Sequence, residues 1–317
     1  MLSRTADHLF WMARYTERAE NTARMLDVNT ETGLMPQSKA TSLRGWRAML
    51  NISELQDRFD QKYAKLTPKD VLDFMVRDDT NPSSIVSCLS QARENARAVR
   101  GTLTTEVWET NNATWLELQA RLKDNSLKDN PVEFFEWVKY RSHLSRGVTI
   151  GTMLKDEAFY FMRIGTFLER ADNTARLLDV KFIGTGTDKP LGSEHPIDFY
   201  YWAALLRSVS AFEIYRKVYR DVITPARVAE LLILRENMPR SLMACVSEVV
   251  VNLKHVGTNA SRETDRFAGK LNAELQFTRI EEILASGLHD YLTAFLENIG
   301  ELGKRISQDF LLPLASE

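Results

Sequence analysis

Two copies of one stretch organise this sequence: Glu17-Arg18-Ala19-Glu20-Asn21-Thr22-Ala23-Arg24-Met25-Leu26-Asp27-Val28 and Glu169-Arg170-Ala171-Asp172-Asn173-Thr174-Ala175-Arg176-Leu177-Leu178-Asp179-Val180. Ten of the twelve positions are identical, and the two changes, Glu20 to Asp172 and Met25 to Leu177, keep charge and bulk. A match of this length at a fixed offset indicates an internal duplication.

The composition is that of a globular protein and excludes several classes. Of the 317 residues, 44% are hydrophobic and 26% are charged, which is enough apolar mass for a core. The net charge of -2 argues against a general nucleic-acid or acidic-membrane binder. No secretory signal or long apolar run is present, so we expect a cytoplasmic protein without a membrane partner. Two cysteines and five scattered histidines predict neither a metal site nor a cofactor.

The spacing of apolar residues predicts an all-α fold. We expect helices over about 5–30, 41–63, 82–108, 112–122 and 152–183, with helical pattern continuing to about 312. Thr67-Pro68-Lys69-Asp70 is typical of a capped helix start, and Asn130-Pro131 begins a helix that runs through Val138. No segment alternates as a strand does.

Marker residues of the first half, such as helix-starting Thr-Pro pairs, recur in the second half. Thr224-Pro225 follows Thr67-Pro68 by 157 residues, as Cys245 follows Cys88. We therefore predict a helical bundle of two similar repeats, 1–150 and 151–317, packed as one body because no Pro/Gly/Ser-rich linker divides them.

The repeated stretch carries the main candidate site. On a helical wheel, its small residues lie on one side and a polar face on the other, formed by Glu17, Arg18, Asn21 and Arg24 and again by Glu169, Arg170, Asn173 and Arg176. One interpretation is a solvent-exposed helix face on which the Glu and Arg side chains form weak ion pairs. The other is a partly buried polar seam or ligand site, because asparagine is a poor helix former and arginine recurs where lysine would serve solubility. In that case Glu17 would pair with Arg170 or Arg176 across a pseudo-twofold axis, and Glu169 with Arg18 or Arg24.

A second candidate lies in the first half alone. Arg93, Asn95, Arg97 and Arg100 follow one another at helical spacing, and three arginines on one face suit an anion. The second half keeps only Asn252 and Lys254 at the corresponding stretch. Ordinary surface charge is the alternative. No catalytic residues are identified.

The doubled Glu-Arg stretch resembles the bacterial alpha-E family, which is named for an all-helical domain with a Glu-Arg signature. Leu2-Ser3-Arg4, Ala92-Arg93-Glu94-Asn95-Ala96-Arg97 and Thr152-Met153 are similar to the family as well, so the resemblance covers nearly the whole chain. It implies a partner, since such proteins are typically encoded beside, or fused to, a circularly permuted ATP-grasp ligase.

Three functions follow as hypotheses. The resemblance implies an accessory subunit of an ATP-grasp-type peptide or amide ligase system, which helps to bind or present a substrate such as a peptide. The chain could instead be an all-helical enzyme that acts on an amide or phosphorylated intermediate. The third hypothesis is a purely structural scaffold with a buried ionic seam.

Overall fold

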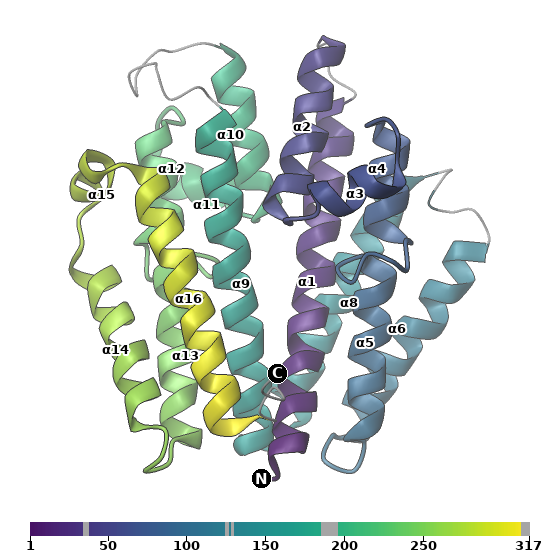
Figure 1. Ribbon diagram of the computed structural model, residues 1–317, viewed down its shortest axis with the longest axis vertical. Helices are drawn as coiled ribbons and strands as arrows, with labels where there is room; N and C mark the ends of the chain where they lie inside the picture. Colours follow the sequence, from purple (N-terminus) through teal and green to yellow (C-terminus); the bar gives the residue numbers. More distant parts are fainter. Residues whose placement is uncertain (34–37, 124–126, 128–129, 185–195, 312–317) are drawn as a thin grey trace. The chain divides into compact units, whose positions relative to one another are not determined.

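The computed structural model describes residues 1–33, 38–123, 127, 130–184 and 196–311 (Figure 1). Every regular element among these residues is an α-helix, and there are fifteen of them. The all-α prediction is confirmed for this part of the chain. The helices belong to two compact units, Met1–Thr166 with the chain end from Phe310, and Phe167–Asp309. We call them unit 1 and unit 2.

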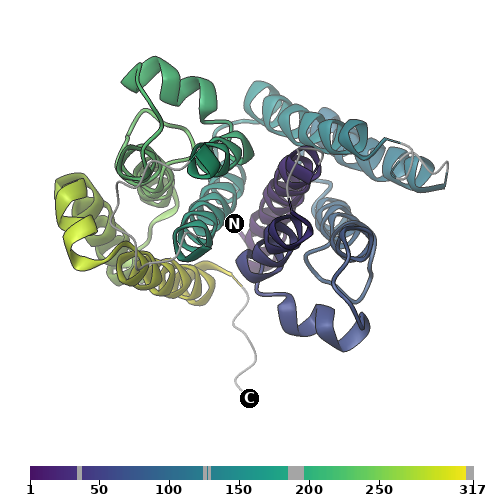
Figure 2. The same cartoon turned by 90° about the horizontal axis from the view of Figure 1, so that it is seen from above.

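Unit 1 is built around one long helix, α1 (Ser3–Gly33), which packs most extensively on α5 (Ile85–Ala98) and next on α8 (Pro131–Thr152). Seen along the helices in Figure 2, α1 has these two helices as neighbours. The remaining elements of the unit are α2 (Lys39–Ile52), α3 (Gln56–Lys62), α4 (Pro68–Val76), α5 (Ile85–Ala98), α6 (Thr105–Lys123), α8 (Pro131–Thr152) and the start of α9 (Glu157–Gly184).

The core of unit 1 forms where these helices meet. Leu9 and Leu26 of α1 are fully buried, as are Phe134 and Phe135 of α8. The beginning of α9 also approaches α1 closely, at Gly165. A Cβ atom at Gly165 would collide with the backbone carbonyl of Phe10, so the residue must lack a side chain for the two helices to lie this close.

Unit 2 contains the rest of α9 and a second set of helices. These are α10 (Pro196–Ser208), α11 (Phe212–Tyr219), α12 (Pro225–Ile233), α13 (Leu242–Val256), α14 (Arg262–Phe277), α15 (Ile280–Ser286) and α16 (Leu288–Phe310). In unit 2, α13 packs along α14. The most deeply buried side chains of this unit include Trp202, Tyr215 and Leu232.

Local capping explains where several helices begin. The Thr67 hydroxyl accepts a hydrogen bond from the amide of Asp70, with Pro68 in the first turn, as the sequence predicts. Thr224 caps α12 in the same way. Asn130 caps α8 by accepting from the amide of Glu133.

Three predicted boundaries are wrong. The helix expected over 41–63 is two helices, because Glu54 has a φ of 54°, a left-handed backbone conformation that an α-helix cannot contain, between α2 and α3. The helix expected over 82–108 ends at Ala98, and α6 starts at Thr105. α8 continues to Thr152, where the next helix was expected to begin. α9 starts instead at Glu157, after Asp156 accepts hydrogen bonds from the amides of Ala158 and Phe159.

Candidate functional site

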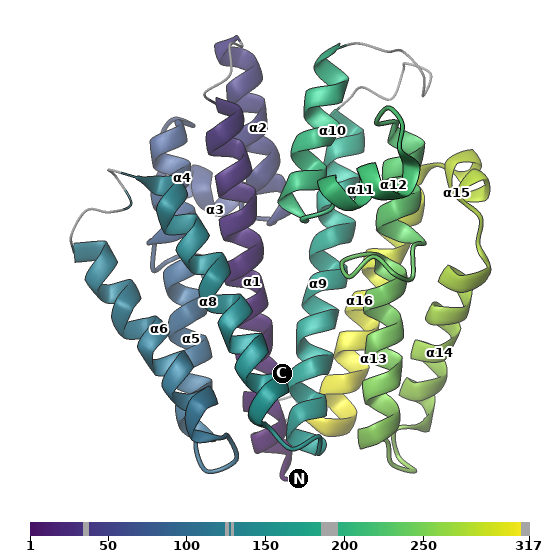
Figure 3. The same cartoon turned by 180° about the vertical axis from the view of Figure 1, so that it is seen from behind.

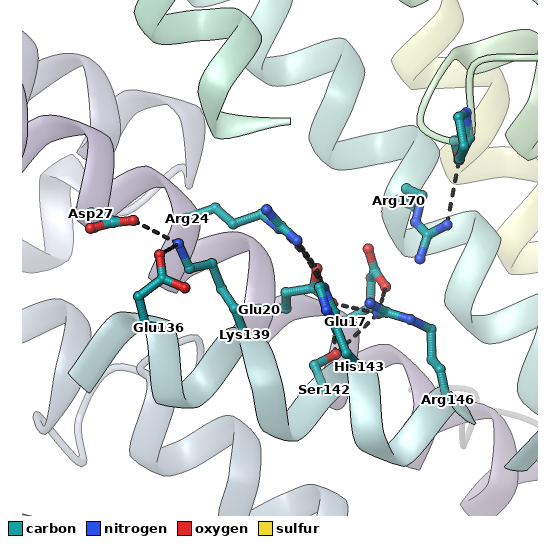
Figure 4. Close-up of polar contacts among 11 residues, drawn as sticks. Glu17, Glu20, Arg24, Asp27, Glu136, Lys139, Ser142, His143, Arg146 and Arg170 are labelled. Atoms are coloured by element: carbon teal, nitrogen blue, oxygen red, sulfur yellow. Dashed lines mark hydrogen bonds and ion pairs between the residues drawn. The ribbon is translucent and has the colours of Figure 1, made fainter. Parts of the chain in front are cut away.

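The polar residues of the first repeated stretch lie buried against α8. Glu17, Glu20, Arg24 and Asp27 recur at i, i+3, i+7 and i+10, which places them on one face of α1. The facing residues of α8 recur at i, i+3, i+4 and i+7 and are Lys139, Ser142, His143 and Arg146. We call these eight residues the Glu-Arg network (Figure 4).

Glu20 is the centre of the network, and its side chain is 0% exposed. One carboxylate oxygen, Oε1, accepts from Arg24 at 2.7–2.8 Å. The other, Oε2, accepts from the Ser142 hydroxyl at 2.7 Å and from Arg146. Charge-assisted hydrogen bonds of this kind are roughly twice as strong as neutral ones, and here they satisfy a carboxylate that has no contact with bulk water.

Arg146 also binds the second buried carboxylate. Its Nη1 atom donates to Glu17 Oε2 at 2.9 Å and to Glu20, and it lies 3.1 Å from the Ser142 hydroxyl. A single guanidinium therefore bridges two carboxylates that are one turn apart on α1. Without this cation, the two buried negative charges would repel each other.

A second link between the helices lies two turns further along α1. Lys139 Nζ donates to Asp27 Oδ2 at 2.7 Å and also contacts Glu136 on its own helix. Within the network, the three carboxylates of Glu17, Glu20 and Asp27 face three cations. Because the charges balance, the network can hold α8 on α1 without leaving a net buried charge.

His143 connects the network to the surface, since its side chain is 54% exposed. Its Nε2 atom lies 3.0 Å from Arg24 Nη2 and 3.5 Å from Glu20 Oε1. His143 and Arg146, whose side chain is 27% exposed, are therefore two side chains that solvent can reach and that contact the buried Glu20 carboxylate.

The second copy of the stretch has different surroundings. Glu169 and Arg170 are buried, and Arg170 lies over the ring of Phe167 and within 3.4 Å of the Pro239 carbonyl oxygen (Figure 4). Arg176 donates twice to Asp172, at 2.8 and 3.1 Å, on the partly exposed side of α9. Asn173 is half-buried.

Asp179 occupies the place that Asp27 has in the first copy. Its partner is His289 of α16, at 2.6 Å, and this contact raises the pKa of the imidazole.

The repeated stretch is therefore buried in part, as the seam hypothesis expects. Glu17, Asn21, Arg24, Glu169 and Arg170 are buried, whereas Arg18 is half-buried and lies over the ring of Tyr15. Glu17 has a partner in its own unit, Arg146. The pairing of the two copies across a pseudo-twofold axis stays a prediction.

Two of the three arginines on the α5 face share one carboxylate. Arg93 and Arg97 both bind Glu94, and the hydrogen bond from Arg97 lowers the pKa of that carboxyl. Arg93 also donates to Asn112 at 3.0 Å, and Arg100 is exposed over the ring of Trp108.

The remaining candidate of this face, Asn95, donates to the Gln91 carbonyl and contacts His8 at 2.7 Å. The contacts with His8 and Asn112 tie α5 to α1 and α6, and of the predicted anion site Arg97 and Arg100 lie exposed.

Sequence reasoning missed the α8 half of the network. Lys139, Ser142, His143 and Arg146 form a polar stripe at helical spacing, which was the available signal, but the helix was expected to run only through Val138. In the described part of the chain, no three His, Cys, Asp or Glu side chains gather as metal ligands would. None of the described helices has the length and hydropathy that a bilayer span requires.

The fold and the network define an all-helical protein with a buried Glu-Arg pair on its central helix. Residues 1–311 match the family model described as "Alpha-E: A predicted alpha-helical domain with a conserved ER motif", and the chain belongs to this family.

Relatives that are similar to the chain are uncharacterized proteins of Mycobacterium bovis and Mycobacterium tuberculosis. Each is 26% identical over 327 aligned residues, which cover 93% of this chain. The chain spans about a third of the length of these relatives, 35%. No solved structure matches it significantly.

Proposed function

We propose that this chain is an accessory subunit of an ATP-grasp-type peptide or amide ligase system in the cytoplasm, where it helps to bind or present the substrate. One observation carries the proposal: the mycobacterial relatives are almost three times as long, so the same domain occurs there beside a large further stretch of polypeptide. A domain that is joined to other domains in relatives is well suited to act as their separate partner.

The buried network supports a presenting role. Its charges are paired within unit 1 and hold α8 against α1, so that a rigid helical surface is available to a partner. Buried ion pairs of this kind fix the register of neighbouring elements more than they add stability.

The two halves are further proposed to be repeats of one ancestral unit, about 1–150 and 151–317, packed as one body. Supporting this, Thr67 and Thr224 cap helices identically, and so do Ser84 and Ser241. Cys88 and Cys245, at matching positions, are both fully buried. Duplication would leave one copy free to diverge, as the change from Glu20 to Asp172 illustrates.

A second candidate function is an enzyme that acts on an amide or phosphorylated intermediate. The observation in its favour is His143, an exposed imidazole held by a buried glutamate and arginine. A purely structural scaffold is the third candidate.

The test is a pull-down with the tagged protein from its native host, at physiological salt, followed by mass spectrometry. Recovery of an ATP-grasp ligase is the expected result, and repeated recovery of the chain alone would overturn the proposal. With the ligase in hand, its ATP turnover is compared with and without the chain.

Two variants separate the candidate functions in that assay. His143→Gln should leave stimulation of the ligase intact if the chain only presents substrate, whereas an enzyme would lose turnover and stay folded. Arg97→Ala, with Lys254→Ala as its counterpart in unit 2, tests whether the arginine face contributes to binding.

A further inference from the structure

Four exposed cations gather around α11 in unit 2. Arg216 and Lys217 lie in the last turn of this helix, Arg220 follows it directly, and Arg207 lies in the last turn of the preceding helix, α10. We call these four residues the α11 basic face. Figure 3 views unit 2 from the side on which α11 lies, next to α10 and α12.

The four side chains form one patch. Arg216 and Arg220 are neighbours one turn apart, and the Arg220 amide donates to the Arg216 carbonyl oxygen at 3.2 Å. Arg207 joins them through Phe212, because its guanidinium carbon lies 5.2 Å from the centre of that ring. Phe212 precedes Arg216 by one turn on the same side of α11. The positive charges are therefore close enough to act on one ligand.

Few negative charges offset this patch. In the part of the chain that the structure describes, none of its four cations forms an ion pair. Glu213 is the one acidic residue of α11, and the nearby Asp221 is already bound by Arg227 at 2.6 Å. The α11 basic face is thus locally positive, although the net charge of the whole chain is -2.

The same local fold forms in unit 1 without these cations. Glu54 and Ser210 lie 156 residues apart, both have a φ of 54°, and each stands two residues before a short helix, α3 or α11. In both places the next amide donates to the carbonyl oxygen five residues earlier, at 2.9 and 2.7 Å. A cation in the last turn favours any helix, but the first half has none at the four matched positions. These are Asn51, Asp60, Gln61 and Ala64.

The backbone beside the patch is held in place by a buried tyrosine. The Tyr215 hydroxyl donates to the Val222 carbonyl oxygen at 2.9 Å and accepts from the Thr224 amide at 3.1 Å, and Tyr215 is fully buried. Val222 itself is 62% exposed. Arg220 has a φ of 53°, the left-handed conformation in which helices usually end on glycine. A fixed loop therefore presents an arginine and an apolar side chain together, which lowers the ordering cost of binding.

This arrangement suits a run of carboxylates. A planar guanidinium binds a carboxylate through two parallel hydrogen bonds. Cations one helical turn apart are separated by about 6 Å along the axis, which is close to the spacing of alternate side chains in an extended peptide. The net negative charge of the chain disfavours a long polyanion such as DNA.

We propose that the α11 basic face binds an acidic peptide segment of a partner protein. Asp or Glu side chains of the segment pair with the arginines, and an apolar residue beside them contacts Val222. The proposal goes beyond a ligase partnership, because any partner with such a segment would serve, and either can fail alone.

Fluorescence anisotropy of a labelled peptide tests this on the full chain. In the peptide, glutamates alternate with serines around a central leucine. We expect a dissociation constant of about 10–100 µM at low salt, and binding at least about tenfold weaker when ionic strength rises from about 0.05 to 0.5 M. The same peptide with glutamine in place of glutamate should not bind.

Charge reversal locates the binding surface. Arg216→Glu/Arg220→Glu should weaken binding at least about tenfold. Lys65→Glu/Lys69→Glu changes two exposed lysines of unit 1, makes the same change in net charge, and should leave the affinity within about twofold. Val222→Ser should weaken binding of the leucine peptide about threefold, but not of a peptide with glycine in that place. An unchanged melting temperature in circular dichroism shows that each variant is folded.

No binding of the glutamate peptide at low salt would refute the proposal, and so would equal losses in the two double variants. Duplex DNA and vesicles that contain phosphatidylserine are the alternative ligands. Tighter binding of either than of the peptide, lost in Arg216→Glu/Arg220→Glu, would overturn the assignment to an acidic peptide.

Discussion

Replacing Glu20 by glutamine tests whether burial of the Glu-Arg network decides its energetic role. The variant keeps the shape of the side chain but removes a carboxylate that is fully buried and bound by Arg24, Ser142 and Arg146. The buried guanidinium of Arg24 and the partly exposed one of Arg146 then lose a counter-charge. Removing one partner of a buried ion pair costs about 3–5 kcal/mol, because the other charge stays buried without compensation.

The repeated stretch offers a matched control. Asp172 stands where Glu20 stands in the first copy, but its side chain is 25% exposed and binds Arg176 as an ordinary i, i+4 pair. Asp172→Asn should therefore cost less than about 1 kcal/mol. For a unit of this size, the Glu20→Gln loss corresponds to a fall in melting temperature of about 6–20 °C.

Two measurements report the difference. Urea unfolding gives the loss of unfolding free energy for each variant. Hydrogen exchange shows where in the chain stability is lost. Amides of α1 and α8 should exchange about 10²–10³-fold faster in Glu20→Gln, and their exchange rates should be unchanged in Asp172→Asn. Equal losses in the two variants would refute the reasoning, since burial is the main feature that distinguishes them.

Three further predictions follow from single contacts. Gly165→Ala should destabilise the protein by about 1–3 kcal/mol in urea unfolding, because its Cβ meets the Phe10 carbonyl; an unchanged midpoint would contradict the close approach. Burial alone would raise the pKa of Asp78, but hydrogen bonds from neighbouring side chains lower it. The stability that this carboxylate contributes is therefore present above about pH 4 and lost as pH falls through its folded pKa, and Asp78→Asn should flatten the acid limb of the pH–stability curve. The raised pKa of His289 gives the opposite pH dependence. Its contact with Asp179 stabilises the folded state fully below about pH 6.5, and this stabilisation is lost as pH rises through the folded pKa. An NMR titration of the imidazole, with His289→Gln as control, would follow this change.

The sequence alone determined the fold class and the starts of several helices. Apolar spacing is a local property, and so are the caps at Thr67 and Asn130, where a side chain bonds an amide three residues away. The break at Glu54 escaped prediction because no proline or glycine lies between α2 and α3, and a single glycine, Gly101, is tolerated within a helical pattern and did not predict the break after Ala98. Membership of the Alpha-E family likewise followed from the repeated stretch.

Only the tertiary structure decided which residues of the repeated stretch are buried and which partners they contact. Glu20 and Asp172 have nearly the same neighbours in sequence, yet one is fully buried and the other is partly exposed. The difference arises from helices more than a hundred residues away: α8 supplies Ser142 and Arg146 to Glu20. Burial and charge pairing depend on which helix packs against which face, and that choice is made by the whole core, so twelve residues cannot specify it.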